Sequence, residues 1–167
     1  MSNIIVVNGV YNDDEALKSV LNYGYKKNIS WNGVGVRTTS MEEAVKSMEY
    51  VKEFWEQTDG KRLCHIVINL GGTGKSYIDC VAEYVADEIA TLVADFIYSR
   101  GYQNCYFKHV SDSGVLHFHF VINNVHILDG RKISSHSELA SDIHRYLLHN
   151  YPRLDWRGVS YHQDCYI

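Results

Sequence analysis

The sequence predicts an α+β protein in which helices flank a central, mainly antiparallel sheet of about five strands. Short apolar runs rich in β-branched residues alternate with longer stretches of helical periodicity. Two of the apolar runs follow one another across a tight turn at 112–114, which is typical of an antiparallel pair. The chain has 167 residues, of which 46% are hydrophobic and 22% charged, so we expect a single domain over residues 1–167.

Local signals place the elements in order along the chain. Acidic residues at 12–15 precede the first helical stretch, and Ser40 forms a capping box with Glu43 before the second. Ser76 can cap a long third helix. The expected elements are a strand at 4–7, helices at about 16–24 and 41–55, a strand at 62–70, a helix from about 76 to 99, strands at 103–111 and 116–125, a further short strand next to the turn at 129–130, and a helix from about 135 to 149.

Composition narrows the functional classes. The net charge is −4, but the acids concentrate at 42–59 and 79–95, and the rest of the chain carries 14 bases against 9 acids. Acidity therefore does not exclude nucleic acid as a ligand, because a surface away from these stretches can be basic. No apolar run is long enough to cross a membrane, and the N-terminus lacks the basic region of a signal peptide. The four cysteines have no Cys-x-x-Cys spacing, so we expect reduced thiols and a cytoplasmic protein.

The strand after the turn carries the strongest chemical signal. Because side chains alternate along a strand, His117 and His119 share one face while Phe118 and Phe120 point to the core. The two imidazoles lie about 6.6 Å apart at Cα, from two strand residues at about 3.3 Å each, and can converge on one metal ion. His109 on the preceding strand can face the same point and supply a third ligand. The alternative is a set of half-buried structural histidines on the sheet face.

Three segments, in this order, resemble the motifs of mobilisation relaxases, which are HUH-type nucleases of plasmids and integrative elements. The segment 109–123 resembles their third motif, His-x-Asp followed by His-x-His and Asn, with Asp112 one residue further from His109 than usual. The strand around His65 resembles the second motif. The segment 17–27 resembles the first motif, in which a nucleophilic tyrosine ends a short helix before basic residues.

This resemblance implies an HUH-endonuclease fold, a relaxase-like nuclease domain and a specific chemistry. The expected activity is metal-dependent, strand-specific nicking and rejoining of single-stranded DNA through a 5′-phosphotyrosine, for plasmid or mobile-element mobilisation. Tyr23 is the first choice for the nucleophile and Tyr25 the alternative, and Asp112 would orient a histidine. The expected cofactor is Mg²⁺ or Mn²⁺, and the expected partners are DNA at an origin-of-transfer-like site and accessory mobilisation proteins. The implied metal ligands are His109, His117 and His119.

Further residues are expected to contact DNA or the metal. The basic residues near the two motifs would bind phosphates, and Trp31 could stack on an unpaired base or pack in the core. His65 either approaches the metal or phosphate, or is a hydrogen-bonded residue of the sheet. The expected DNA contacts are Lys26, Lys27, Lys75, Asn123, Arg131 and Lys132.

A glycine-rich stretch at 69–76 follows a predicted strand and precedes a predicted helix, as a nucleotide-binding P-loop does. That motif requires glycine where this chain has Asn69, so we expect no nucleotide. Lys75 and the start of the helix are instead expected to contact a DNA phosphate.

Two other readings remain open. An HUH-type replication initiator or transposase would have the same site chemistry and differ in its DNA substrate. A catalytically inactive relaxase-like domain would bind DNA or a partner without forming a covalent intermediate.

Overall fold

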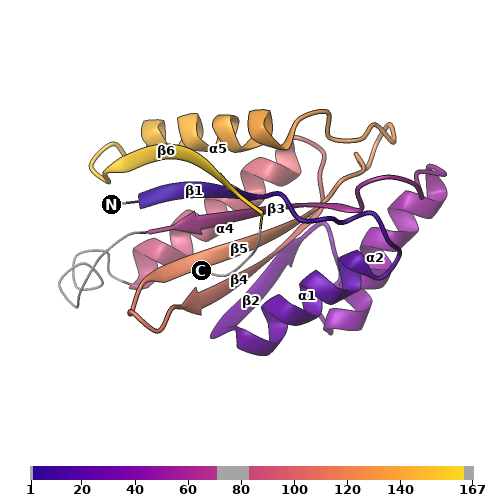
Figure 1. Cartoon of the computed structure of the whole chain (residues 1–167), viewed down its shortest axis with the longest axis horizontal. Helices are drawn as coiled ribbons and strands as arrows, with labels where there is room; N and C mark the ends of the chain where they lie inside the picture. The colour runs from indigo at the N-terminus through magenta and orange to yellow at the C-terminus, as the bar shows by residue number, and fades with distance from the viewer. Residues whose placement is uncertain (1, 71–82, 164–167) are drawn as a thin grey trace.

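A six-stranded sheet forms the middle layer of the protein, and helices cover both of its faces (Figure 1). The structure is a computed structural model that describes residues 2–70 and 83–163. The order of the strands across the sheet is β2 (Ser30–Val34), β4 (Asn104–Val110), β5 (Leu116–Asn123), β3 (Leu63–Asn69), β1 (Ser2–Val7) and β6 (Trp156–His162).

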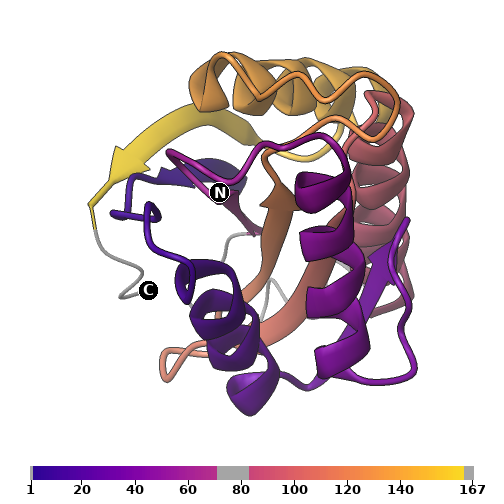
Figure 2. The ribbon, with the colours of Figure 1, turned by 90° about the vertical axis from the view of Figure 1, so that its right-hand side faces the viewer.

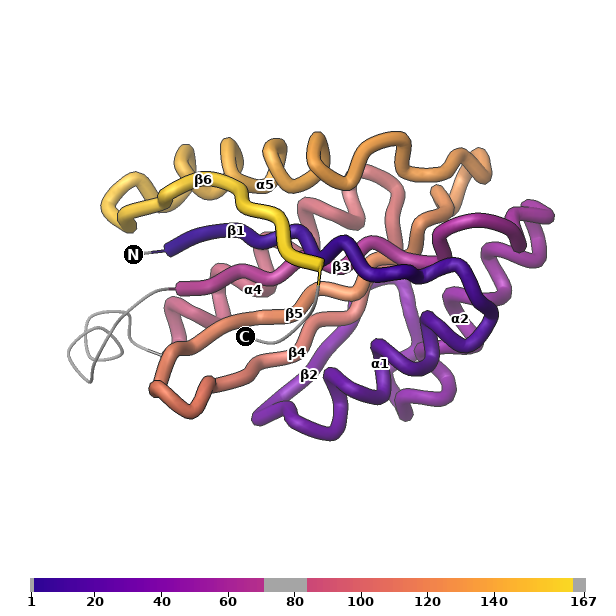
Figure 3. The backbone as a smooth tube through the Cα atoms, in the orientation of Figure 1, coloured from indigo at the N-terminus to yellow at the C-terminus, as the bar shows by residue number. Residues whose placement is uncertain are grey.

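The sheet is mainly antiparallel, as expected, because β1–β6 is the only parallel pair among the described strands. It has six strands among the described residues rather than about five. Neither β2 nor β6 was expected, and the short strand expected next to the turn at 129–130 is only an isolated bridge between Val125 and Lys132. β2 is a short edge strand with no buried side chain, so it lacks an apolar pattern. β6 lies beside β1 although the two are far apart in sequence, and Figure 3 shows the first and last strands running together. A pairing between strands so far apart in the chain cannot be predicted from the local sequence pattern of either strand.

Two of the described helices cover each face of the sheet (Figure 2). α1 (Ala16–Lys27) and α2 (Met41–Phe54) pack on one face, and α4 (Glu83–Ser99) and α5 (His136–Asn150) pack on the other. The N-cap half of the expected capping box is confirmed, because the Ser40 hydroxyl accepts a hydrogen bond from the Glu43 N–H at 3.1 Å, whereas the Glu43 carboxylate pairs with Arg37 and Lys46. α1 continues about one turn beyond its expected end at Gly24. The expected cap Ser76 lies outside the described residues.

Alternation along β5 gives the sheet its two different faces. Phe118, Phe120 and Ile122 are buried in the core that α4 and α5 complete. Val121 faces the other way and packs under α1 and α2. The two histidines of β5 share the face of Val121, so α1 lies on the same side of the sheet as they do.

Candidate active site and metal centre

A pocket of about 590 Å³ opens between the C-terminal part of α1 and the turn that joins β4 to β5. The sequence placed its candidate nucleophile in one motif and the metal ligands with Asp112 in another, and the fold brings them to this one pocket. Its lining residues are Tyr23, Lys27, His109, Val110, Ser111, Asp112, Ser113, His117 and His119.

The register of the β4–β5 hairpin assembles the three histidines. His109 lies directly opposite His117, and His119 follows two residues later on the same face. The ring centroid of His119 lies 4.5 Å from that of His109 and 5.1 Å from that of His117. One ring nitrogen from each histidine lies within 4.8 Å of the other two. Nitrogens that share one ion at about 2.1 Å lie no more than about 4.2 Å apart, so small ring rotations suffice to bind a metal.

Hydrogen bonds fix which nitrogen of each ring carries the proton. His109 Nε2 lies 3.0 Å from the Gly24 carbonyl oxygen, and His117 Nδ1 lies 3.1 Å from that of Val115. A carbonyl can only accept, so these nitrogens must donate. The lone pair is then on Nδ1 of His109 and Nε2 of His117. Neutral imidazoles oriented in this way match the second-shell pattern of metal-binding histidines.

Gly24 connects the tyrosine helix to this cluster. Its carbonyl holds His109, and its α-carbon packs so closely on β4 that an added Cβ would lie 2.7 Å from the Phe107 ring. α1 can therefore approach the sheet only with glycine at this position. The contact fixes the neighbouring Tyr23 relative to the histidines.

His65 lies behind the cluster and holds His119. Its Nε2 lies 3.0 Å from His119 Nδ1, and its Nδ1 lies 3.2 Å from the hydroxyl of Tyr11. His65 is 1% exposed and does not line the pocket. Of the two roles expected for His65, the geometry shows the hydrogen-bonded residue of the sheet. Tyr11 carried no sequence signal, because it lies in an irregular segment before α1.

Burial keeps the histidines neutral, which is the form that binds metals. Desolvation lowers the pKa of His109 and His117, and it lowers that of His65 to about 4. The pKa of His119 falls furthest, because burial adds to repulsion by the three neighbouring imidazoles. A divalent cation that binds here therefore needs to release few protons from the histidine rings.

The two candidate tyrosines lie in different surroundings. Tyr23 lines the pocket, with its ring edge-on to His119 at 6.5 Å between centroids and Lys27 Nζ 5.4 Å from its own ring centroid. Tyr25 instead contacts Trp31 edge-on at 5.9 Å, outside the pocket lining. Trp31 stacks on Phe107 at 6.3 Å, so its ring takes part in packing.

Asp112 is exposed on the turn at the pocket rim. Within residues 2–70 and 83–163 it makes no hydrogen bond to a histidine. The orienting role expected of Asp112 is taken in this structure by the Gly24 and Val115 carbonyls and by His65.

The expected DNA contacts do not form one surface. Lys27 lines the pocket and Lys26 is exposed beside it. Arg131 is paired with Asp129, and Lys132 with Asp59. Lys75 lies outside the described residues.

Asn123 is fully buried, and its amide is used inside the protein. It donates to the Met48 carbonyl at 3.0 Å and to Gln103 Oε1 at 2.8 Å. It therefore has no surface to offer DNA in this fold, contrary to the expected contact.

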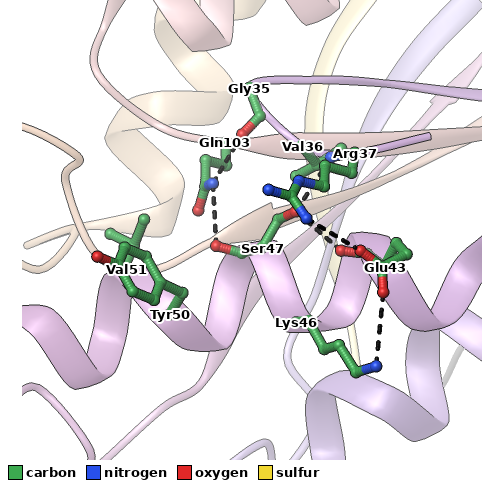
Figure 4. A pocket seen from close by; sticks show the side chains of 9 residues that line it. All are labelled: Gly35, Val36, Arg37, Glu43, Lys46, Ser47, Tyr50, Val51 and Gln103. Atoms are coloured by element: carbon green, nitrogen blue, oxygen red, sulfur yellow. Dashed lines mark hydrogen bonds and ion pairs between the residues drawn. The ribbon is translucent and has the colours of Figure 1, made fainter. Parts of the chain in front are cut away.

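A hollow of similar size, about 600 Å³, lies beside α2 (Figure 4). Arg37 and Lys46 both contact Glu43 there, at 3.4 and 3.5 Å. The Gln103 amide donates to the carbonyls of Gly35 and Ser47. Its polar groups are thus largely paired with one another, and the described residues place no cluster of reactive side chains in it.

Comparison with known families identifies the chain. Residues 11–148 match the model of the family described as "Relaxase: MobA/VirD2-like, nuclease domain". The chain belongs to this family, which confirms the resemblance seen in the sequence. Comparisons with curated proteins and with solved structures found no match. Among the described helices, none combines the length and the apolar character needed to cross a membrane.

Proposed function

We propose that this domain nicks and rejoins single-stranded DNA in a metal-dependent reaction, with Tyr23 as the nucleophile. The observation that carries the proposal is the single pocket that Tyr23 shares with three converging neutral histidines. Membership of the relaxase family supports the DNA substrate. The biological role that follows is mobilisation of a plasmid or another mobile element from an origin-of-transfer-like site.

The histidine cluster fits a divalent metal. His109 Nδ1, His117 Nε2 and His119 Nε2 would be the ligands, since the other nitrogen of each ring is engaged in a hydrogen bond. Mg²⁺ or Mn²⁺ bound there would neutralise charge on the phosphate oxygens and leave positions open for them. His65 and Tyr11 act as positioning residues that hold the His119 ring.

The chain's own residues carry out the transesterification. The Tyr23 oxygen forms a bond to the scissile phosphorus, the bond from phosphorus to the 3′ oxygen breaks, and the proton of the tyrosine passes to that oxygen. The products are a 5′-phosphotyrosine and a free 3′-OH, and the reverse reaction rejoins the strand. Lys27 lies beside Tyr23 and favours the anionic substrate.

The test is a search for covalently linked DNA. The protein is incubated with Mn²⁺ and a pool of single-stranded oligonucleotides of random sequence, then digested with protease and examined by mass spectrometry. We expect nucleotides on the peptide that contains Tyr23, and their loss in Tyr23→Phe. Nucleotides on Tyr25 alone would assign the nucleophile to the alternative residue. No adduct, with DNA binding intact, would favour the inactive DNA-binding domain.

A further inference from the structure

A second hollow, of about 300 Å³, lies between the start of α1 and the C-terminal half of α2. It shares no residue with the histidine pocket. Two basic side chains and the first turn of a helix meet there, and the reaction proposed above uses none of them. The lining residues are Asp14, Leu17, Glu49, Lys52, Glu53, Thr58 and Arg62.

Lys52 is buried without a partner. Its side chain is 6% exposed, and it makes no hydrogen bond or ion pair within residues 2–70 and 83–163. Burial lowers the pKa of Lys52 to about 8, with repulsion by Arg62 adding to this shift and attraction by Glu49 partly opposing it. The ammonium is therefore still charged at neutral pH. Glu49 offsets this largely buried charge only from beyond ion-pair distance, so an anion that enters the hollow and contacts Lys52 is stabilised there.

Arg62 offers a second unmet donor. Its side chain is 12% exposed, one terminal nitrogen pairs with Asp14, and Nε is buried with no hydrogen-bond partner among the described residues. The Arg62 backbone N–H donates to the Tyr11 carbonyl at 2.7 Å, which fixes where the side chain begins.

The first turn of α1 adds a weaker contribution. Its N-cap, Glu15, makes no side-chain capping hydrogen bond, so the positive end of this 12-residue helix is not neutralised by its cap. The carboxylates of the hollow do not remove the demand for an acceptor. Asp14 forms an ion pair with Arg62, and neither Glu49 nor Glu53 forms an ion pair with Lys52.

We propose that this hollow binds a phosphate oxyanion, with Lys52 Nζ and the Arg62 guanidinium as its positive groups. Phosphate has several acceptor oxygens and can satisfy donors that approach from α2 and from the segment before β3. The phosphate belongs either to a DNA strand or to a free phosphate compound. Leu17 in this hollow precedes Tyr23 in the reactive pocket by six residues of α1, about 9 Å along the helix axis. A DNA strand could therefore reach both the hollow and the reactive pocket, and this version of the proposal rests on the function proposed above.

The first experiment measures thermal unfolding of the full chain in inorganic phosphate, against chloride at the same ionic strength. Lys52→Met removes the ammonium and keeps an apolar stem, so the variant is expected to fold. Lys46→Met is the matched control, because Lys46 is exposed on the same helix and paired with Glu42 at 2.8 Å. We expect phosphate to raise the melting temperature of the wild type and of Lys46→Met, but not of Lys52→Met. Equal stabilisation of all three proteins, or of none, would overturn the proposal.

A second experiment separates the two sources of phosphate. Binding of a fluorescent oligothymidylate is measured by anisotropy over a range of salt concentrations. If the ligand is a DNA phosphate, Lys52→Met lowers affinity and reduces the slope of log K against log salt by about 0.7. An unchanged slope, with the phosphate response lost, assigns the hollow to a free phosphate compound. Phosphate stabilisation without any binding of oligothymidylate would keep the hollow as a phosphate site and count against the DNA function instead.

Discussion

The two ends of β5 carry polar side chains on the same face of the sheet, but they use them differently. At the start of the strand, His117 and His119 each fix one ring nitrogen by a hydrogen bond and offer the other to the cluster. At the far end, Asn123 uses its amide on Met48 and Gln103, inside the protein. The strand pattern marks all three residues equally. The hydrogen-bond inventory separates the ligands from the structural residue.

Substitution of Tyr23, the pocket tyrosine, is expected to have the largest effect on nicking activity. Tyr23→Phe removes the attacking oxygen, so we expect nicking of single-stranded DNA to fall by roughly 10³-fold or more. Tyr25→Phe should keep wild-type activity, because Tyr25 contacts Trp31 outside the pocket. Both variants are compared in a cleavage assay with Mn²⁺. Normal cleavage by Tyr23→Phe would show that the pocket is not the reactive centre.

A pH titration tests the structural character of the far end of β5. There His136 Nε2 lies 3.0 Å from the side-chain oxygen of Asn124, and burial lowers the pKa of His136 to about 4. Between about pH 6.5 and 4, the unfolded chain binds a proton that the folded chain does not. As the pH is lowered from about 6.5 to 4, the free energy of unfolding should therefore decrease, by about 2 kcal/mol for His136 alone.

The matched variants are His136→Gln and, at an exposed position, His162→Gln. Urea unfolding of metal-free protein at several pH values should show a weaker pH dependence for the first and an unchanged one for the second. An identical dependence in all three proteins would mean that His136 is not held neutral by the fold.

The third prediction concerns the residues behind the metal ligands. His65→Phe keeps an aromatic ring but removes the partner of His119 Nδ1, so we expect Mn²⁺ affinity to fall by about 10- to 100-fold. Tyr11→Phe should have a smaller effect in the same direction. Val67→Ala is the control, because Val67 is buried opposite His119 and makes no hydrogen bond to it through its side chain. Its stability should fall while its metal affinity stays near the wild type, and equal losses in His65→Phe and Val67→Ala would refute positioning.

The smallest expected effect is on DNA affinity, and it separates two of the expected DNA contacts, Lys27 and Arg131. Lys27 lines the pocket, whereas the Arg131 guanidinium is paired with Asp129 at 2.7 Å. Lys27→Ala should weaken binding of single-stranded DNA several-fold and reduce the salt slope by about 0.7. Arg131→Ala should change neither quantity. A larger loss of DNA affinity in Arg131→Ala than in Lys27→Ala would indicate that DNA binds near the far end of β5.

The sequence predicts those parts of the fold that local patterns encode. The β4–β5 hairpin follows from alternation and from the turn in which Gly114 adopts a φ of +80°, and the register of the histidines follows from that turn. Other parts depend on contacts between distant segments. His109 hydrogen-bonds to the Gly24 carbonyl, and His65 hydrogen-bonds to the Tyr11 hydroxyl. Both bonds join segments that are distant in sequence, so no periodic pattern of residues predicts them. The pairing of β6 with β1 is hidden for the same reason.

We propose that His109, His117 and His119 together form one metal site. Its most direct test is a calorimetric titration of Mn²⁺ into metal-free protein, with and without oligothymidylate, for the wild type and for the double variant His117→Ala/His119→Ala. Phe118 and Phe120 retain the core packing of β5, so the variant should remain folded. We predict one Mn²⁺ site per wild-type molecule and none in the variant. Equal binding to both proteins, or no binding to the wild type under either condition, would contradict the account.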